Sequence, residues 1–174
     1  MTGTGLFRTG GGLLRACCAA LALFAAVHGE EAAAPYPVQA ALFVKLLAFH
    51  NGLSGDVTVY VVADDGFRAE MAKGVGKPVG KATLKAVEGG ADLPAAVPSA
   101  IYVSSEAKTA AVTAYCRKNK ILSMTGATAL VSAGISLGVG VSGDKPTVLL
   151  NPAASKEEGV DWNPAIMKIA QIVK

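Results

Sequence analysis

The chain has 174 residues, a net charge of +3, a hydrophobic content of 52% and a charged content of 17%. Two of its 16 basic residues, Arg8 and Arg15, lie in the first 29 positions, whereas all 13 acidic residues come later, so the remainder carries a net charge of +1. This near-neutral balance, with scattered lysines, excludes a surface that follows nucleic-acid phosphates, and we expect no nucleic-acid partner.

The N-terminal segment, residues 1–29, has the composition of a secretory signal peptide. Arg8 and Arg15 precede an apolar run over residues 16–27, and a small residue, Gly29, follows shortly after that run. A helix needs about twenty apolar residues to cross a bilayer, so this run is too short for a permanent anchor. We therefore expect cleavage near Gly29 and a mature protein in the periplasm.

Two alternatives to cleavage near Gly29 stay open: an uncleaved membrane helix, and a lipoprotein anchored at Cys17. Arg15 argues against the lipoprotein because a small residue is needed at its position. Removal of residues 1–29 leaves 145 residues, the usual size of one domain. We expect residues 30–35 to form a disordered lead-in and residues 36–174 to form a single domain.

The first predicted helix covers residues 37–49 and is apolar on nearly every side. Such a helix must be covered on more than one side, either by its own domain or by a partner. Its large apolar side chains include Phe43, Leu46 and Phe49. We expect these three residues to be anchored in a core or to bind a partner protein.

A run of β-branched residues over 56–62 is typical of a strand buried on both faces, and a helix over residues 67–73 follows it. Asp64 and Asp65 lie between them, and Ser104 ends a later predicted strand. Open α/β sheets bind ligands at this edge, so these three residues are candidates for a ligand site. Helix capping by the two aspartates is the alternative, and it explains both without a ligand.

The remaining segments alternate between strand and helix patterns. Strands are expected over residues 82–87, 99–104, 121–124, 135–141 and 146–150, and helices over residues 105–120 and at the C-terminus. The last helix is indicated by a stripe of apolar residues: Trp162, Ile166, Ile169, Ala170 and Val173. This alternation predicts an α/β fold, a Rossmann-like three-layer arrangement of a mostly parallel sheet with helices on both faces, ending in a β-hairpin and a final helix.

Three features that could indicate a cofactor or catalytic site are better explained by structural roles. Residues 138–143 match the G-x-G-x-x-G spacing, but they lie inside a strand and its turn instead of opening a helix. Cys116 is left without a second cysteine after residue 29, so we expect a buried structural thiol. His50 falls at a helix end, where capping is expected. We predict no catalytic residue, no cofactor and no metal site.

Several segments resemble the YfiR-like periplasmic family, and together they cover roughly residues 36–173. They are the apolar helix at residues 38–49, the strand at 57–62, Asp65-Gly66-Phe67, the loop at 76–80, Ile121-Leu122-Ser123, and the tail from Gly134 through Leu150-Asn151 to residue 173. The chain departs from the family where His50-Asn51 replaces a frequent Trp-Pro, and where Ser99 replaces a frequent cysteine. The second departure argues against a family-like disulfide.

The resemblance implies a regulator that is not an enzyme. Members are similar to a periplasmic protein that binds the sensor domain of an inner-membrane diguanylate cyclase and restrains cyclic-di-GMP signalling and biofilm formation. The expected partner is therefore such a cyclase or another inner-membrane sensor protein, and a homodimer is left open. Two other classes stay open as well: a periplasmic small-ligand-binding protein, and an accessory of a transport or export system.

Overall fold

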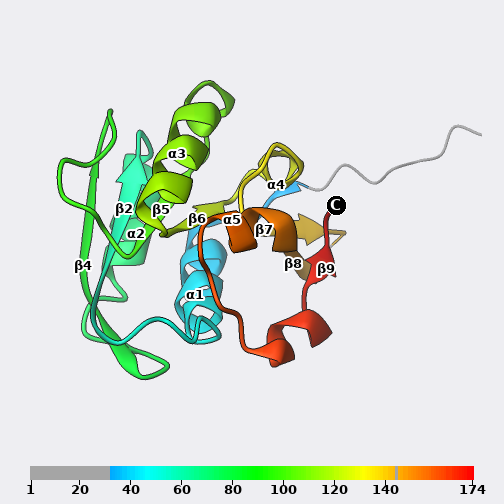
Figure 1. Ribbon diagram of the computed structural model, residues 1–174, viewed down its shortest axis with the longest axis horizontal. Coiled ribbons are helices and arrows are strands. Elements are labelled where there is room, and N and C mark those ends of the chain that lie inside the picture. The colour runs from blue at the N-terminus through cyan, green and yellow to red at the C-terminus, as the bar shows by residue number, and fades with distance from the viewer. Residues whose placement is uncertain (1–31, 144) are drawn as a thin grey trace, which may run out of the picture.

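A computed structural model describes residues 32–143 and 145–174 of the chain (Figure 1). The predicted signal peptide lies outside these described residues, so its cleavage stays a prediction. The helices and strands are β1 (Ala32–Ala33), α1 (Tyr36–Leu47), β2 (Gly55–Val62), α2 (Asp65–Ala72), β3 (Pro78–Val79), β4 (Ala82–Gly90), β5 (Ala100–Val103), α3 (Glu106–Asn119), β6 (Leu122–Thr125), α4 (Ala129–Ser132), β7 (Leu137–Ser142), β8 (Lys145–Leu150), α5 (Pro152–Glu157), the 3₁₀-helix η1 (Pro164–Lys168) and β9 (Gln171–Ile172).

The strands form one sheet in the order β3-β4-β2-β5-β6-β7-β8-β9, with β1 beside β7. The five strands β4, β2, β5, β6 and β7 are parallel to one another, whereas β3 pairs antiparallel with β4, and β7 and β8 form an antiparallel hairpin. This arrangement confirms the predicted α/β fold with a mostly parallel sheet and a C-terminal hairpin. The strand order also creates a topological switch point between β2 and β5.

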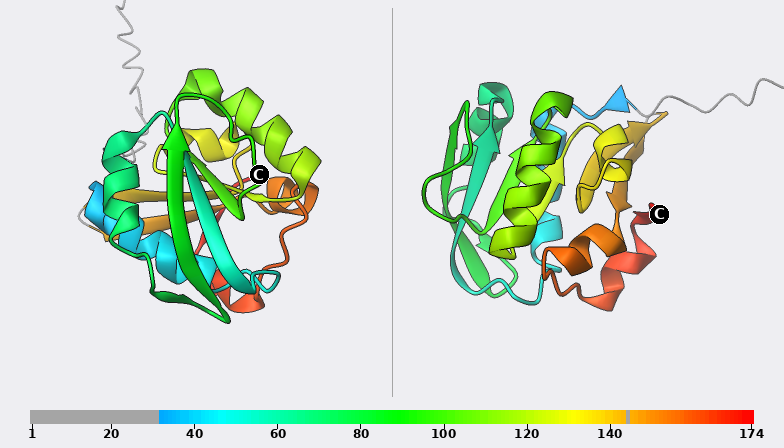
Figure 2. Two further views of the ribbon diagram at one scale, coloured as in Figure 1. Left: turned by 90° about the vertical axis from the view of Figure 1, so that its left-hand side faces the viewer. Right: turned by 45° about the horizontal axis from the view of Figure 1, so that its top comes forward.

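Helices cover both faces of the sheet (Figure 2). Side chains of α1 and α2 share one apolar cluster with one face, and side chains of α3 and α4 share a second cluster with the other face. Strands β5 and β6 are buried at every position. Their residues are therefore apolar or hydroxyl-bearing throughout, as expected for parallel strands between two helical layers.

Aromatic rings build the centre of the cluster under α1 and α2. Phe67 and Tyr102 stack with their ring centroids 3.6 Å apart, and Phe43 meets Phe67 edge to face at 5.8 Å. All three side chains are buried. The Tyr102 hydroxyl donates a 2.9 Å hydrogen bond to Oε1 of Gln39. This bond satisfies the side-chain amide oxygen of Gln39, which is buried on the inner side of α1. Burial thus explains most of the unusual apolar content of α1.

The C-terminal segment differs from the predicted final helix. Pro164 and the Asn163 side chain, which accepts a 2.9 Å hydrogen bond from the Ala165 N–H, start a helical turn, but η1 ends at Lys168. Residues 171–172 then pair with the end of β8 as a parallel strand. A short helix is costly to nucleate, and the free edge of β8 offers backbone partners that a single turn lacks. The final helix is therefore shorter than predicted.

The predicted disordered lead-in is wrong for residues 32–35. Ala32 and Ala33 form β1, which pairs antiparallel with Val141 and Gly140 of β7, and the Ala34 side chain is buried in the core. The alanine-rich composition suggested disorder because it offers little apolar surface. Backbone pairing with an exposed edge of β7 supplies the missing stabilisation.

Candidate functional site

Asp64 lies at the switch point, directly after β2, and caps α2. Its Oδ1 accepts a 2.9 Å hydrogen bond from the Phe67 N–H, and its Oδ2 accepts bonds from the hydroxyls of Ser104 at 2.8 Å and Tyr36 at 3.2 Å. Ala63, just before it, has a left-handed backbone with φ of +52°, which turns the chain from strand to helix. The structure therefore brings two of the three candidate ligand residues, Asp64 and Ser104, together.

The third candidate ligand residue, Asp65, does not join this cluster. Its carboxylate is exposed and forms a 2.9 Å ion pair with Arg68, one turn later in α2. The carboxylate of Asp64 is occupied by three donors of the protein itself, which agrees with the capping interpretation. Burial and the hydrogen bond to Asp64 both raise the pKa of Tyr36. A ligand at this edge of the sheet stays a prediction.

The residues expected to bind a partner divide between core and surface. Phe43 and Leu46 are buried in the cluster under α1, whereas Phe49 is half-buried. Phe43 and Leu46 must therefore be reassigned from partner binding to core packing, because α1 turns its large side chains toward the sheet. The accessible side of α1 carries smaller and charged residues, including Ala41 and Lys45.

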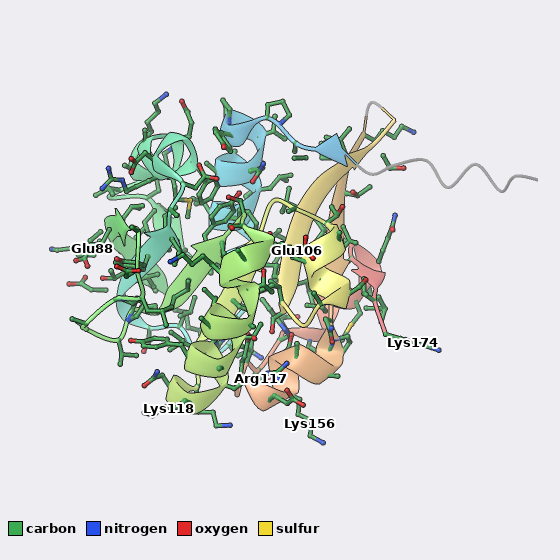
Figure 3. The ribbon with its side chains drawn as sticks, turned by 90° about the horizontal axis from the view of Figure 1, so that it is seen from above. Glu88, Glu106, Arg117, Lys118, Lys156 and Lys174 are labelled. Carbon is green, nitrogen blue, oxygen red and sulfur yellow. The ribbon has the colours of Figure 1, made fainter. Side chains whose placement is uncertain are left out.

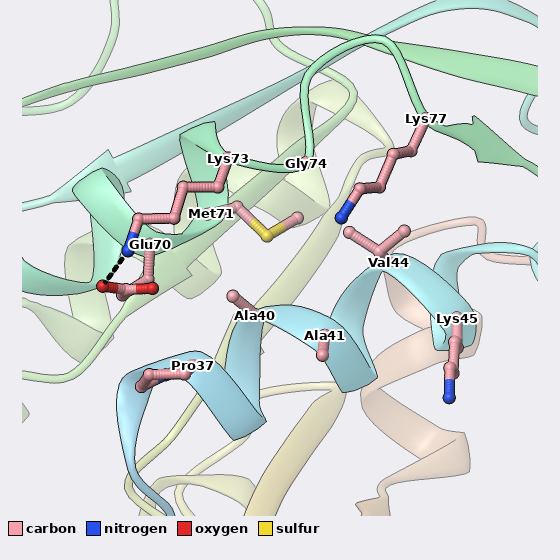
Figure 4. Close-up of a pocket in the computed structure, with 10 residues that line it drawn as sticks. All are labelled: Pro37, Ala40, Ala41, Val44, Lys45, Glu70, Met71, Lys73, Gly74 and Lys77. Carbon is pink, nitrogen blue, oxygen red and sulfur yellow. Dashed lines mark hydrogen bonds and ion pairs between the residues drawn. The ribbon is translucent and has the colours of Figure 1, made fainter.

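A groove of about 320 Å³ lies between this accessible side of α1 and the helix α2 with the loop that follows it (Figure 4). Alanine and valine side chains of α1 and Met71 of α2 line it, and lysines surround it. The sequence predicted both helices but not the groove, because the side chains that form it are small and ordinary. Its lining residues are Pro37, Ala40, Ala41, Val44, Lys45, Glu70, Met71, Lys73, Gly74 and Lys77.

A second hollow, of about 340 Å³, lies between α3 and the loop after β4. Val62, Leu93 and Val112 give it apolar walls. Lys108 and Asp92 also line it, and their side chains form a 3.4 Å ion pair. These two charges neutralise one another, so this hollow has no excess charge that selects a ligand.

Glu158 is a buried carboxyl that the sequence analysis did not single out. It follows α5, and its Oε2 accepts a 2.5 Å hydrogen bond from the Ser136 hydroxyl, while Ser123 of β6 donates to both of its oxygens. Burial raises the pKa of Glu158, and the serine hydrogen bonds and the charge of Arg117 oppose that rise. Glu158 follows a short helix with charged residues at its end, a pattern that is typical of an exposed helix end, so its burial could not be predicted from the sequence.

Near Glu158, an ion pair connects α5 to α3. Arg117, near the end of α3, lies beside α5 (Figure 3) and forms a 2.8 Å ion pair with Glu157. Cys116 of the same helix is fully buried, and burial raises the pKa of its thiol. The thiol is therefore a structural group, as the sequence predicted.

Two kinds of feature are absent from residues 32–143 and 145–174. They contain no cluster of three or more His, Cys, Asp or Glu side chains arranged to hold a metal ion. None of the helices in this part of the chain is both long and apolar enough to cross a membrane.

A family model described as YfiR/HmsC-like matches residues 36–171, from the start of α1 to the first residue of β9. No curated protein matches the chain.

Proposed function

Because the chain belongs to the YfiR/HmsC-like family, we propose that it is a secreted periplasmic protein that binds the periplasmic sensor domain of an inner-membrane diguanylate cyclase and holds that enzyme inactive. The observation that carries this proposal is the family match, which spans nearly the whole folded domain. Regulation then occurs by reversible protein binding, and the chain itself turns over no substrate. The signal-peptide pattern of residues 1–29 supports the compartment.

The polar groups of the structure also support binding rather than turnover. The carboxylates of Asp64 and Glu158 are both held by hydrogen bonds from the protein itself, and the Cys116 thiol is buried. His50 uses its Nδ1 to accept a 3.0 Å hydrogen bond from the Gly52 N–H, and burial lowers its pKa. A catalytic acid, base or nucleophile must be free to reach its substrate. These four side chains are instead engaged within the fold.

Deletion of the gene in its own host tests this function. We expect the deletion to raise cyclic-di-GMP and biofilm output, and a secreted copy of the protein to restore both to the original level. A copy that lacks residues 1–29 is the matched control, because it carries the same domain in the wrong compartment. An unchanged cyclic-di-GMP level in the deletion strain, with the cyclase expressed, would contradict the proposal.

One observation favours small-ligand binding as a second candidate function. Asp64 and Ser104 meet at the switch point between β2 and β5, the place where open α/β sheets bind ligands. A ligand present at a hundred times its dissociation constant should stabilise the protein by about 2.7 kcal/mol. Thermal melting with periplasmic metabolites therefore tests it, and no shift with any of them would count against this candidate.

A further inference from the structure

The geometry points to the groove between α1 and α2 as a docking site for a short protein segment that combines apolar side chains with Asp or Glu. This inference rests on the proposed function, since it names the surface through which the regulator would hold its partner. It also replaces the assignment of Phe43 and Leu46, whose side chains are buried on the opposite side of α1.

The floor of the groove is apolar and closely packed. Ala40, Val44 and Met71 line it, and Ala40 and Met71 are packed into the core. The loop closes tightly against this floor at Gly74, where an added Cβ would lie 3.1 Å from the Met71 carbonyl oxygen and 3.2 Å from a Val44 methyl. The groove therefore exists before a partner arrives, which lowers the entropic cost of binding.

The charge around this floor is positive. Lys45, Lys73 and Lys77 line the groove together with a single carboxylate, Glu70, which forms a 2.6 Å ion pair with Lys73. Figure 4 shows the Lys77 side chain reaching across toward Val44, while Lys45 points away from α2. Because Lys73 is paired with Glu70 and Lys45 points away, the Lys77 ammonium beside the apolar walls is the charge that complements a carboxylate of the occupant.

The length of the groove favours a protein segment over a lipid. Its α1 wall runs from Pro37 to Lys45, which at about 1.5 Å per residue is roughly 12 Å. This wall is shorter than one hydrocarbon leaflet, about half of the roughly 30 Å core of a bilayer, so a membrane acyl chain would stay partly uncovered. Two turns of a helix, or a few extended residues, match it.

The test measures binding between the exported protein, purified from the periplasm, and the periplasmic domain of the cyclase that it controls. Ala41→Trp adds a bulky ring at the exposed rim of the groove, and Lys77→Glu reverses the charge of an exposed side chain. Ala114→Trp and Lys118→Glu are the matched controls, because both positions are exposed on α3, on the other face of the sheet. Circular dichroism melting verifies that all four variants fold.

We expect Ala41→Trp to weaken binding about tenfold or more and Lys77→Glu about fivefold, with both controls close to wild type. Added salt should weaken wild-type binding and leave the Lys77→Glu variant less affected. Wild-type affinity in both groove variants, with the wild type still binding, would overturn the docking site and leave the proposed function intact.

If the cyclase domain does not bind at all, the proposed function fails, and the docking site needs a test that does not depend on that partner. Random twelve-residue peptides are displayed and selected on the wild-type protein, with counter-selection on the Ala41→Trp variant. Enrichment of peptides that combine Asp or Glu with apolar residues supports the site. Failure to enrich such peptides, or preferential binding of dodecanoate that Ala41→Trp abolishes, would overturn it.

Discussion

The ring of Phe43 meets the ring of Tyr102 edge to face, with centroids 5.9 Å apart and planes at 81°. Through this contact α1 is joined to β5 at the centre of the sheet. Edge-to-face aromatic pairs add about 0.5–1.5 kcal/mol to the free energy gained by burial alone. The helix that the sequence marks as most apolar is thus anchored in the core by its largest inner side chain.

Truncation of this anchor should strongly destabilise the domain. We expect Phe43→Ala to lower the free energy of unfolding by about 3–5 kcal/mol, because the side chain is fully buried and would leave a cavity. Phe49→Ala is the matched comparison, since its ring is half-buried and should cost clearly less. Urea denaturation measures both, and equal costs would contradict the division of α1 into a core side and an open side.

Removal of the α2 cap should have a moderate and chemically specific effect. We expect Asp64→Ala to destabilise the protein by about 1–2 kcal/mol, because the Phe67 N–H would lose its acceptor and the hydroxyls of Ser104 and Tyr36 theirs. Asp64→Asn keeps an oxygen acceptor and should cost less. Asp65→Asn, at an exposed position, should stay close to wild type in thermal melting; a larger loss there than at Asp64 would contradict this account.

Glu158 should make stability depend on pH. Its pKa in the folded protein is raised above the ordinary 4.5 by burial, so the native state holds its proton more tightly than the unfolded state. The contribution of this proton to the free energy of unfolding is fully present below the ordinary pKa. It is lost as the pH rises through the raised pKa of the folded protein. Glu158→Gln cannot ionise, so its stability relative to wild type should increase as the pH rises above about 4.5.

Urea denaturation of both proteins between acidic and neutral pH measures this difference. Glu158→Ala provides a second comparison, because it would leave the donors of Ser123 and Ser136 without their buried acceptor, at a cost of about 1–3 kcal/mol for each group. A stability difference between wild type and the glutamine variant that stays constant with pH would show that Glu158 keeps one protonation state throughout.

Processing of the N-terminus provides the fourth prediction. We expect the exported protein to begin close to residue 30, because the basic residues and the short apolar run of residues 1–29 match a cleaved signal. N-terminal sequencing of protein from the periplasmic fraction measures this directly. Recovery of the chain with Met1 intact in the cytoplasm would count against both the compartment and the proposed function.

The sequence predicted the parts of the fold that local patterns determine. The β-branched run before Asp64 became β2, and the acidic residues after it began α2, because capping and burial act over a few residues. The places of Asp64 and Ser104, just after the carboxyl ends of β2 and β5, also followed from the pattern of each segment. Each of these features depends on a pattern that a single segment carries.

The features that were missed depend on contacts between distant segments. β1 and β9 exist because β7 and β8 offer free edges, and nothing in the alanines of β1 specifies that pairing. The burial of Glu158 depends on serines from two other segments. The groove beside α1 is a space between two helices, so its shape could not be deduced from either helix alone.

The last segment of the chain closes over the end of α1. The Asn163 N–H donates a 2.7 Å hydrogen bond to the Phe49 carbonyl, the Asn51 N–H donates a 2.8 Å bond to the Asp161 carbonyl, and the rings of His50 and Trp162 lie 5.7 Å apart. A chain that emerges from a membrane channel N-terminus first cannot make these contacts until nearly all of it has passed. If the chain is exported as proposed, the domain is therefore completed late in its passage, and truncation before Asp161 would remove the hydrogen bonds that hold Phe49 and Asn51.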